Sequence, residues 1–242
     1  IRMTTHIETS AKQLDHDQEQ VLTYLDQFYL DDQAVLTALE FSVDELNAFL
    51  DQQILPAPSY VVRAQRLSSV VFGDLIELPI SDTRYFHRGL LPEMQRRVLM
   101  AQRLGVAAAL AEIEQSFRDE CKQALRAWHM STDDQHWPLH DCFDKDGGVI
   151  FEALQKRLGD FWRYYQQGVF GLCVSDPSSI GTIVEKELLQ EALTQLMDSD
   201  AKGHRDLHQI PTLQQRYAKA CMPFTAIEFP RSSRCRLLRA ME

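Results

Sequence analysis

One short segment gathers residue types that bind metals, His136-Trp137-Pro138-Leu139-His140-Asp141-Cys142. Imidazole, carboxylate and thiolate groups are ligands that zinc accepts. His136, His140 and Cys142 are therefore the candidate metal ligands, and zinc is the metal they would suit. No second ligand cluster stands at a standard spacing, so the alternative is a polar surface loop that Trp137 anchors. No other cofactor is evident.

A second candidate for chemistry is Tyr85-Phe86-His87-Arg88-Gly89. His87 could act as a general base, and the fork of Arg88 could hold an anion. Because no nucleophile or acid partner is nearby in the sequence, the alternative is a purely structural His-Arg pair.

The end of the chain is rich in arginine and contains Arg231, Arg234 and a Ser232-Ser233 pair. These groups suit a phosphate or an acidic partner surface. Docking against the acidic N-terminal part of the chain is the alternative. We also consider a cleft that Arg88 and Arg234 share around a carboxylate or phosphate ligand. In the opposing interpretation each arginine pairs with a nearby carboxylate.

Cysteine chemistry receives little support from the sequence. The five cysteines are scattered without a CxxC pair, which favours reduced thiols and a cytoplasmic protein. Cys173 follows Gly168 and Gly171, but no neighbouring histidine or evident helix start would lower its pKa. We therefore interpret Cys173 as a small buried apolar residue, and the glycines predict a short strand or turn.

Most of the chain is predicted to be helical, because apolar residues recur at three- and four-residue steps. The strongest stripe, over 106–128, predicts the central core helix and includes Phe117. Ser42 and Glu45 form a capping box. The predicted helices cover 14–29, 31–39, 43–52, 91–104, 106–128, 149–165, 178–197 and 212–221.

Only one region favours β-structure. Tyr60-Val61-Val62 and Val70-Val71-Phe72 predict short strands around Gly73. The expected fold is therefore mainly α, a multi-helix domain over 73–242 behind an N-terminal helix-turn-helix-like module over 1–72, with at most a minor β-hairpin. No run of apolar residues is long enough for a membrane helix.

The segment 29–56 resembles the helix-turn-helix at the start of MerR-type regulators. That resemblance implies two helices, a tight turn and a following wing. The chain has Glu40 where the family usually has a turn glycine, and Asp44, Glu45 and Asp51 where the family presents basic residues. Since acidic side chains repel phosphates, we interpret the segment as a packing scaffold, and nucleic acid is not an expected partner.

A wider resemblance is carried by short motifs spread over most of the chain. They are Ser59-Tyr60, Tyr85-Phe86-His87-Arg88-Gly89, Gly168, Gly171, Cys173, Lys186-Glu187 and Ser232-Ser233-Arg234. In these the chain is similar to an uncharacterised bacterial family labelled as natural-product-biosynthesis proteins. The resemblance implies an association with biosynthetic pathways and assigns no catalytic residue.

The functional expectation is a non-catalytic binding or accessory protein for a small molecule or a protein partner. The first alternative is an enzyme with a site near His87, Arg88 and the 136–142 loop. The second alternative is a DNA-binding transcriptional regulator. The sequence carries no signal for a membrane partner or for a particular oligomeric state.

The charge distribution yields a testable prediction about DNA. Residues 1–60 carry eleven acidic against two basic side chains, whereas residues 201–242 carry eight basic against three acidic ones. Phosphate contacts supply most non-specific affinity for duplex DNA. Because the acidic N-terminal part repels phosphates, the chain should not bind duplex DNA at physiological salt. Fluorescence anisotropy with a labelled duplex would measure this, and salt-dependent binding through residues 1–72 would contradict the prediction.

Overall fold

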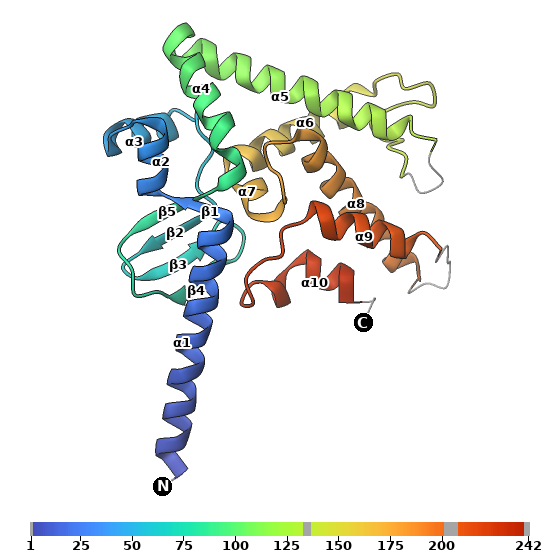
Figure 1. The fold of residues 1–242 in the computed structure, drawn as a ribbon. Helices are drawn as coiled ribbons and strands as arrows, with labels where there is room; N and C mark the ends of the chain where they lie inside the picture. Colours follow the sequence, from blue (N-terminus) through green and yellow to red (C-terminus); the bar gives the residue numbers. More distant parts are fainter. Residues whose placement is uncertain (1, 133–136, 201–207, 240–242) are drawn as a thin grey trace.

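The structure is a computed structural model that describes residues 2–132, 137–200 and 208–239, with side chains over 14–132, 137–198 and 208–239. A small sheet with three helices forms one part, and the remaining helices gather beside it (Figure 1). The helices are α1 (Arg2–Phe28), α2 (Asp32–Leu39), α3 (Val43–Asp51), α4 (Leu91–Leu104), α5 (Val106–His129), α6 (Phe151–Gln166), α7 (Val169–Cys173), α8 (Ile180–Asp200), α9 (Ile210–Ala220) and α10 (Ser233–Leu238). Two short 3-10 helices are η1 (Arg88–Leu90) and η2 (Phe229–Arg231).

The sheet corrects the predicted fold class. It has five antiparallel strands in the order β1-β5-β2-β3-β4, so the expectation of at most a minor hairpin was wrong. The strands are β1 (Tyr29–Asp31), β2 (Tyr60–Arg63), β3 (Arg66–Ser69), β4 (Gly73–Glu77) and β5 (Thr83–His87). The chain is therefore a mixed α/β protein. The boundary predicted at residue 72 falls in the turn between β3 and β4, two strands that pair.

The strand error has a physical cause. Val70-Val71-Phe72, predicted as a strand, is a turn in which Val71 is exposed. The pairing strand is instead the polar segment Arg66–Ser69, because Ala64 and Gln65 both adopt positive φ and close a tight two-residue hairpin with β2. β1 pairs with β5, more than fifty residues away in the chain, and a local pattern carries no signal for that pairing.

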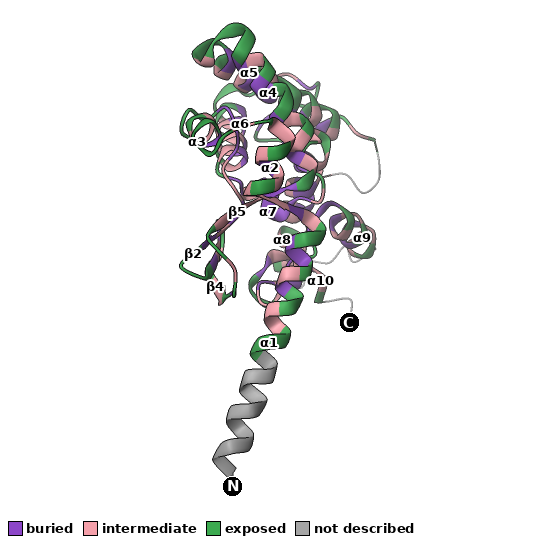
Figure 2. Ribbon diagram, turned by 60° about the vertical axis from the view of Figure 1, so that its left-hand side comes forward, coloured by how far each residue is buried: buried purple, intermediate pink, exposed green. Residues whose placement is uncertain are grey.

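The helix predictions agree well with the structure. Ser42 caps α3, and both hydrogen bonds of the capping box with Glu45 are present. The C-cap of α2 is Glu40, which takes the left-handed conformation with φ of 56° where glycine would be less strained. In α1, buried residues lie toward the C-terminal end, as Figure 2 shows. Within the described residues, no helix is both long and apolar enough to cross a membrane.

α5 is confirmed as the central core helix. Ile113, Phe117, Cys121 and Leu125 are buried along one stripe, and α4, α6 and α8 pack against this helix. The segment after α6 was predicted as a short strand or turn, but residues 169–173 form the helix α7. Only Val174 makes an isolated antiparallel bridge, with Cys221.

Two glycines let α7 approach the sheet. Gly168 has a φ of 76°, and a Cβ there would collide with the carbonyl oxygens of Ala57 and Pro58. A Cβ on Gly171 would come within 2.6 Å of Ser59 Oγ. The short contact is held by hydrogen bonds from Ser59 Oγ to Gly168 O (2.9 Å) and from Tyr29 Oη to Gly171 O (3.1 Å). This contact positions α7, whose last residue is Cys173, against the segment 57–59.

The packing of α5 yields a stability prediction. Phe117 is only 4% exposed and contacts the rings of Trp162 and Tyr165. Phe117→Ala should lower the free energy of unfolding by roughly 3–5 kcal/mol, because it removes buried surface and leaves a cavity. Urea unfolding measures the change. Leu99→Ala, at a 65% exposed position on α4, is the control and should cost far less; equal losses would contradict this assignment of the core.

Candidate functional site

A cavity of about 350 Å³ lies between the β3–β4 turn, helices α6 to α8 and the C-terminal segment. We call it the Lys186 cavity. Four aromatic side chains line it together with aliphatic ones, and its polar groups come mainly from α8 and the C-terminal segment. The lining residues are Val71, Phe72, Tyr164, Val169, Phe170, Cys173, Lys186, Glu187, Gln190, Phe224, Arg231 and Ser233.

Lys186 places a buried cation in this cavity. The residue is 3% exposed, and its Nζ donates to Glu187 Oε1 at 2.8 Å and lies 3.6 Å from Cys173 Sγ. Burial alone would lower the pKa of the Lys186 ammonium, but the acidic groups beside it, Cys173 and Glu187 foremost, outweigh burial and raise the pKa well above its usual value. At neutral pH the ion-pair partner is Glu187, because Cys173 is then a protonated thiol. Lys186 is therefore charged at neutral pH.

Cys173 is a neutral thiol next to this cation. Burial raises its pKa to about 12, although the neighbouring Lys186 acts in the opposite direction. Because the thiolate is the nucleophilic form of cysteine, Cys173 at neutral pH is a weak nucleophile and a small polarisable wall of the cavity. The interpretation of Cys173 as a buried residue agrees with its exposed fraction of 9%.

A hydroxyl network closes one side of the cavity. Ser233 Oγ lies 2.9 Å from Tyr217 Oη, and both hydroxyls hydrogen-bond to Gln190 Oε1, at 3.0 and 3.2 Å. Since its oxygen is occupied in this way, the side-chain NH₂ of Gln190 is the part of the amide left to meet a ligand. Among the described residues it has no hydrogen-bond partner.

Arg231 stands at the mouth of the cavity. Its Nη2 donates to Phe72 O at 2.7 Å, and its guanidinium lies 5.3 Å from the centre of the Phe72 ring. The Phe72 ring in turn meets Phe224 edge to face at 5.8 Å. These contacts join the C-terminal segment to the β3–β4 turn across the cavity.

The side chain of Glu228 connects the C-terminal segment to the sheet. Its side chain is fully buried, and its Oε2 accepts from Tyr60 Oη at 2.7 Å and from Thr225 Oγ1 at 2.8 Å. Tyr60 belongs to β2, so one buried carboxylate ties the segment that carries Arg231 and Ser233 to the centre of the sheet. Breaking such a buried interaction is costly, which makes the cavity wall rigid.

The structure separates the arginines that the sequence singled out. Arg231 lines the Lys186 cavity, but Arg234 does not, because its Nη1 donates to the carbonyls of Ala218 and Cys221 at the end of α9. Arg88 donates to the carbonyl of Asp26 at 2.7 Å and so ties η1 to α1. Arg88 and Arg234 thus bind backbone carbonyls of different elements, and the pairing with carboxylates considered for them is not what the described contacts show.

His87 lies at the end of β5 as a buried, neutral imidazole. Its Nδ1 accepts the amide of Gly89 at 3.1 Å, and Tyr29 packs edge to face against the ring. Burial lowers the pKa of His87 to about 4, against a smaller opposing effect of Asp176. His87 is absent from the lining of the Lys186 cavity and packs between the sheet and α7.

The predicted metal loop is only partly described. His136 lies outside the described residues, His140 is exposed and Cys142 is buried. Within 137–200 and the other described ranges, no three potential ligands gather around one point. The loop is anchored instead on α5, where His129 Nδ1 accepts the amide of Leu139 at 3.0 Å. The zinc site stays a prediction.

Sequence reasoning missed most of the cavity. In the sequence, Lys186 and Glu187 stood out only as part of a family motif and Phe72 only as part of a predicted strand, and Gln190 was not singled out. The available signal was Lys186 itself, which lies between the apolar residues Val184 and Leu188 on α8, all three of them buried. A lysine within such a run must find a partner, and this signal could have marked the site.

Comparison with known proteins adds one family. The model of a family of unknown function, DUF6058, matches residues 113–242. The chain belongs to this family. The matched region runs from α5 to the end of the chain and contributes every lining residue of the Lys186 cavity except Val71 and Phe72. No curated protein and no solved structure matches the chain.

The buried state of His87 predicts how stability depends on pH. Its pKa is about 4 in the folded chain and about 6.5 when unfolded, so the unfolded chain takes up the proton first as pH falls. The stabilisation that comes from the neutral, buried His87 is fully present above pH 6.5. As the pH falls toward 4, the free energy of unfolding should decrease by up to roughly 3 kcal/mol. The loss should be absent in His87→Gln when unfolding free energies are compared across this range.

A matched control separates this effect from the titration of carboxylates. His16 is exposed on α1, so His16→Gln should retain the pH dependence of the parent chain. A His87→Gln variant with the same slope as the parent between pH 6.5 and 4 would refute the assignment.

Proposed function

We propose that this chain is a non-catalytic binding protein for a small molecule with an apolar or aromatic body and one anionic group. The observation that carries the proposal is the buried ammonium of Lys186 in a cavity that four aromatic side chains help to line. Pockets of a few hundred Å³ with apolar walls and a few convergent polar groups are typical of small-molecule sites. A place beside natural-product biosynthesis, as the sequence resemblance implies, is compatible with such a ligand.

The polarity of the cavity favours an anionic ligand. Lys186 and Arg231 bring two positive charges and Glu187 one negative charge, so the lining is net positive. The amide NH₂ of Gln190 adds a further donor. A carboxylate would match these donors, and each charge-assisted hydrogen bond in a partly dry cavity is worth more than a neutral one.

The state of Cys173 supports binding rather than thiol chemistry. A thiol whose pKa is about 12 is protonated at neutral pH. The ammonium of Lys186 donates its short hydrogen bond to Glu187. The carboxylate among the lining residues, Glu187, accepts a hydrogen bond from Lys186 at 2.8 Å, which weakens it as a general base for the thiol. The groups of the cavity thus suit the binding of a ligand that is already anionic in solution.

The proposal predicts a difference between acids and their amides. Benzoate and phenylacetate should raise the melting temperature of the chain and bind saturably in calorimetry, whereas benzamide and phenylacetamide should bind at least about tenfold more weakly. Lys186→Met, which keeps the apolar stem, should remove the preference for the acid. Equal binding of acids and amides, or no binding of either, would contradict the proposal.

Two further variants guard against a folding artefact. Lys186→Met leaves Glu187 without its cation, so the double variant Lys186→Met with Glu187→Gln removes both charges together. Lys122→Met changes an exposed lysine on α5 and serves as the matched control. Arg231→Gln should weaken acid binding, while Arg236→Gln, in α10 outside the lining, should not.

A further inference from the structure

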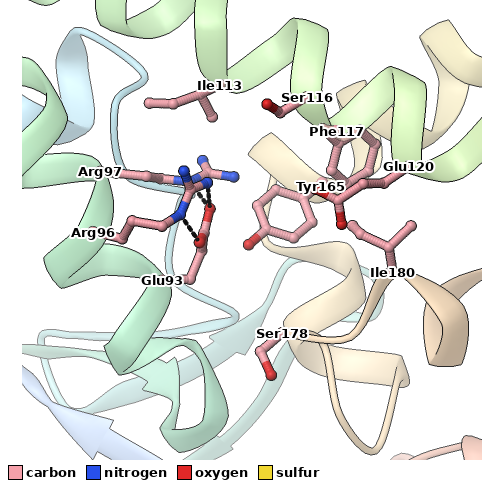
Figure 3. Close-up of a pocket in the computed structure, with 10 residues that line it drawn as sticks. All are labelled: Glu93, Arg96, Arg97, Ile113, Ser116, Phe117, Glu120, Tyr165, Ser178 and Ile180. Carbon is pink, nitrogen blue, oxygen red and sulfur yellow. Dashed lines mark hydrogen bonds and ion pairs between the residues drawn. The ribbon is translucent and has the colours of Figure 1, made fainter.

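A second cavity lies on another side of α6, where α4, α5, α6 and the start of α8 meet. It measures about 260 Å³, and polar side chains dominate its lining (Figure 3). We call it the Arg97 cavity. No residue is common to its lining and that of the Lys186 cavity, so the two are independent sites.

Arg97 has hydrogen-bond donors that its protein partners do not use. Its side chain is 1% exposed, its Nε donates to Glu93 Oε1 at 2.7 Å, and its Nη1 donates to Ile54 O and Gln166 Oε1, both at 3.3 Å. A guanidinium has five N–H groups. Both N–H groups of Nη2 remain without an acceptor among the described residues, so they are free to bind a ligand in the cavity.

Those unpaired donors face the cavity. In Figure 3 the guanidinium of Arg97 projects from α4 into the space in front of Tyr165. The guanidinium carbon lies 4.7 Å from the centre of the Tyr165 ring, which fixes the plane of the fork. The hydroxyl of Tyr165 likewise has no partner among the described residues, and burial raises its pKa to about 12, so it is a donor at neutral pH.

The neighbouring charges leave the cavity with a positive face. Glu93 accepts two hydrogen bonds from Arg96, at 2.7 and 2.8 Å, in addition to the one from Arg97. One carboxylate thus serves two guanidinium groups, and the trio carries a net charge of +1. Burial would raise the pKa of Glu93, but both arginines outweigh it and lower the pKa, which keeps the carboxylate ionised and engaged.

The start of α8 adds to this face. α8 spans 21 residues and begins at Ile180, which lines the cavity. The first N–H groups of a helix lack intrahelical acceptors and carry partial positive charge, so they favour an anion. Ser179 Oγ already accepts the amide of Thr182 at 3.2 Å, so this helix end contributes partial positive charge, while the free donors come from Arg97 and Tyr165.

We propose that the Arg97 cavity binds a small, singly charged oxyanion, a carboxylate group, between Arg97, Arg96 and Tyr165. An Arg fork matches the two oxygens of a carboxylate, which would satisfy the unpaired Nη2 donors. Glu120 lines the rim as an exposed carboxylate, which brings the formal charge of the whole lining to zero and adds repulsion for each further negative charge on a ligand. The site therefore discriminates against dianionic phosphate.

Titration of the full chain with sodium acetate tests the proposal, with sodium chloride at the same ionic strength as the reference. The Nε–H signals of arginine in NMR spectra give a readout for Arg97 itself, and acetate should shift its signal saturably at millimolar concentration. Inorganic phosphate at pH 8 should bind more weakly than acetate. Equal shifts in acetate and chloride would overturn the proposal.

Variants that keep the fold assign the effect to the cavity. Tyr165→Phe keeps the ring under Arg97, and Arg96→Gln changes an exposed residue; each should weaken acetate binding by about five- to tenfold. Glu120→Gln should strengthen phosphate binding and bring it closer to that of acetate. Arg103→Gln, on the exposed last turn of α4, is the matched control and should change nothing.

The two cavities can be told apart in the same experiment. Lys186→Met should leave the acetate shift of Arg97 intact, because the linings share no residue. Acetate binding that is lost in Lys186→Met and retained in Tyr165→Phe and Arg96→Gln would place the anion in the Lys186 cavity and overturn the assignment made here.

Discussion

The close approach of α7 to the sheet is the constraint on which the rest of the structure depends. Gly168 and Gly171 are the two positions where a Cβ would strike the segment 57–59. Only without those atoms can Ser59 and Tyr29 hydrogen-bond to the carbonyls of α7. Because α6 and α8 flank α7 in the chain, this contact fixes where these helices meet the sheet. All three helices line the Lys186 cavity.

α6 acts as the partition between the two cavities. Tyr164 lines the Lys186 cavity and the next residue, Tyr165, lines the Arg97 cavity. Successive residues on a helix point about 100° apart, so one aromatic helix can wall two separate spaces. α8 contributes to both in a different way, with its first residue at one cavity and the face bearing Lys186 at the other.

In both cavities a glutamate on the same helix neutralises the buried cation. Lys186 pairs with the adjacent Glu187, and Arg97 pairs with Glu93 one helical turn away. A buried charge without a partner would cost several kcal/mol, so these glutamates make the sites possible without a ligand. In each case the pairing uses only part of the donor capacity of the cation, and the remainder is available to an anion.

The sequence by itself determined the helical part of this protein. The stripe through Phe117, the capping box of Ser42 and Glu45, and the approximate limits of most helices follow from local periodicity and local hydrogen bonds, and the structure has them. Only the tertiary structure decided the sheet, because β1 and β5 pair across more than fifty residues and β3 is a polar segment that pairing alone makes a strand. The same holds for the sites: Lys186, Arg231 and Phe72 meet through packing between distant segments, and no spacing along the chain encodes that encounter.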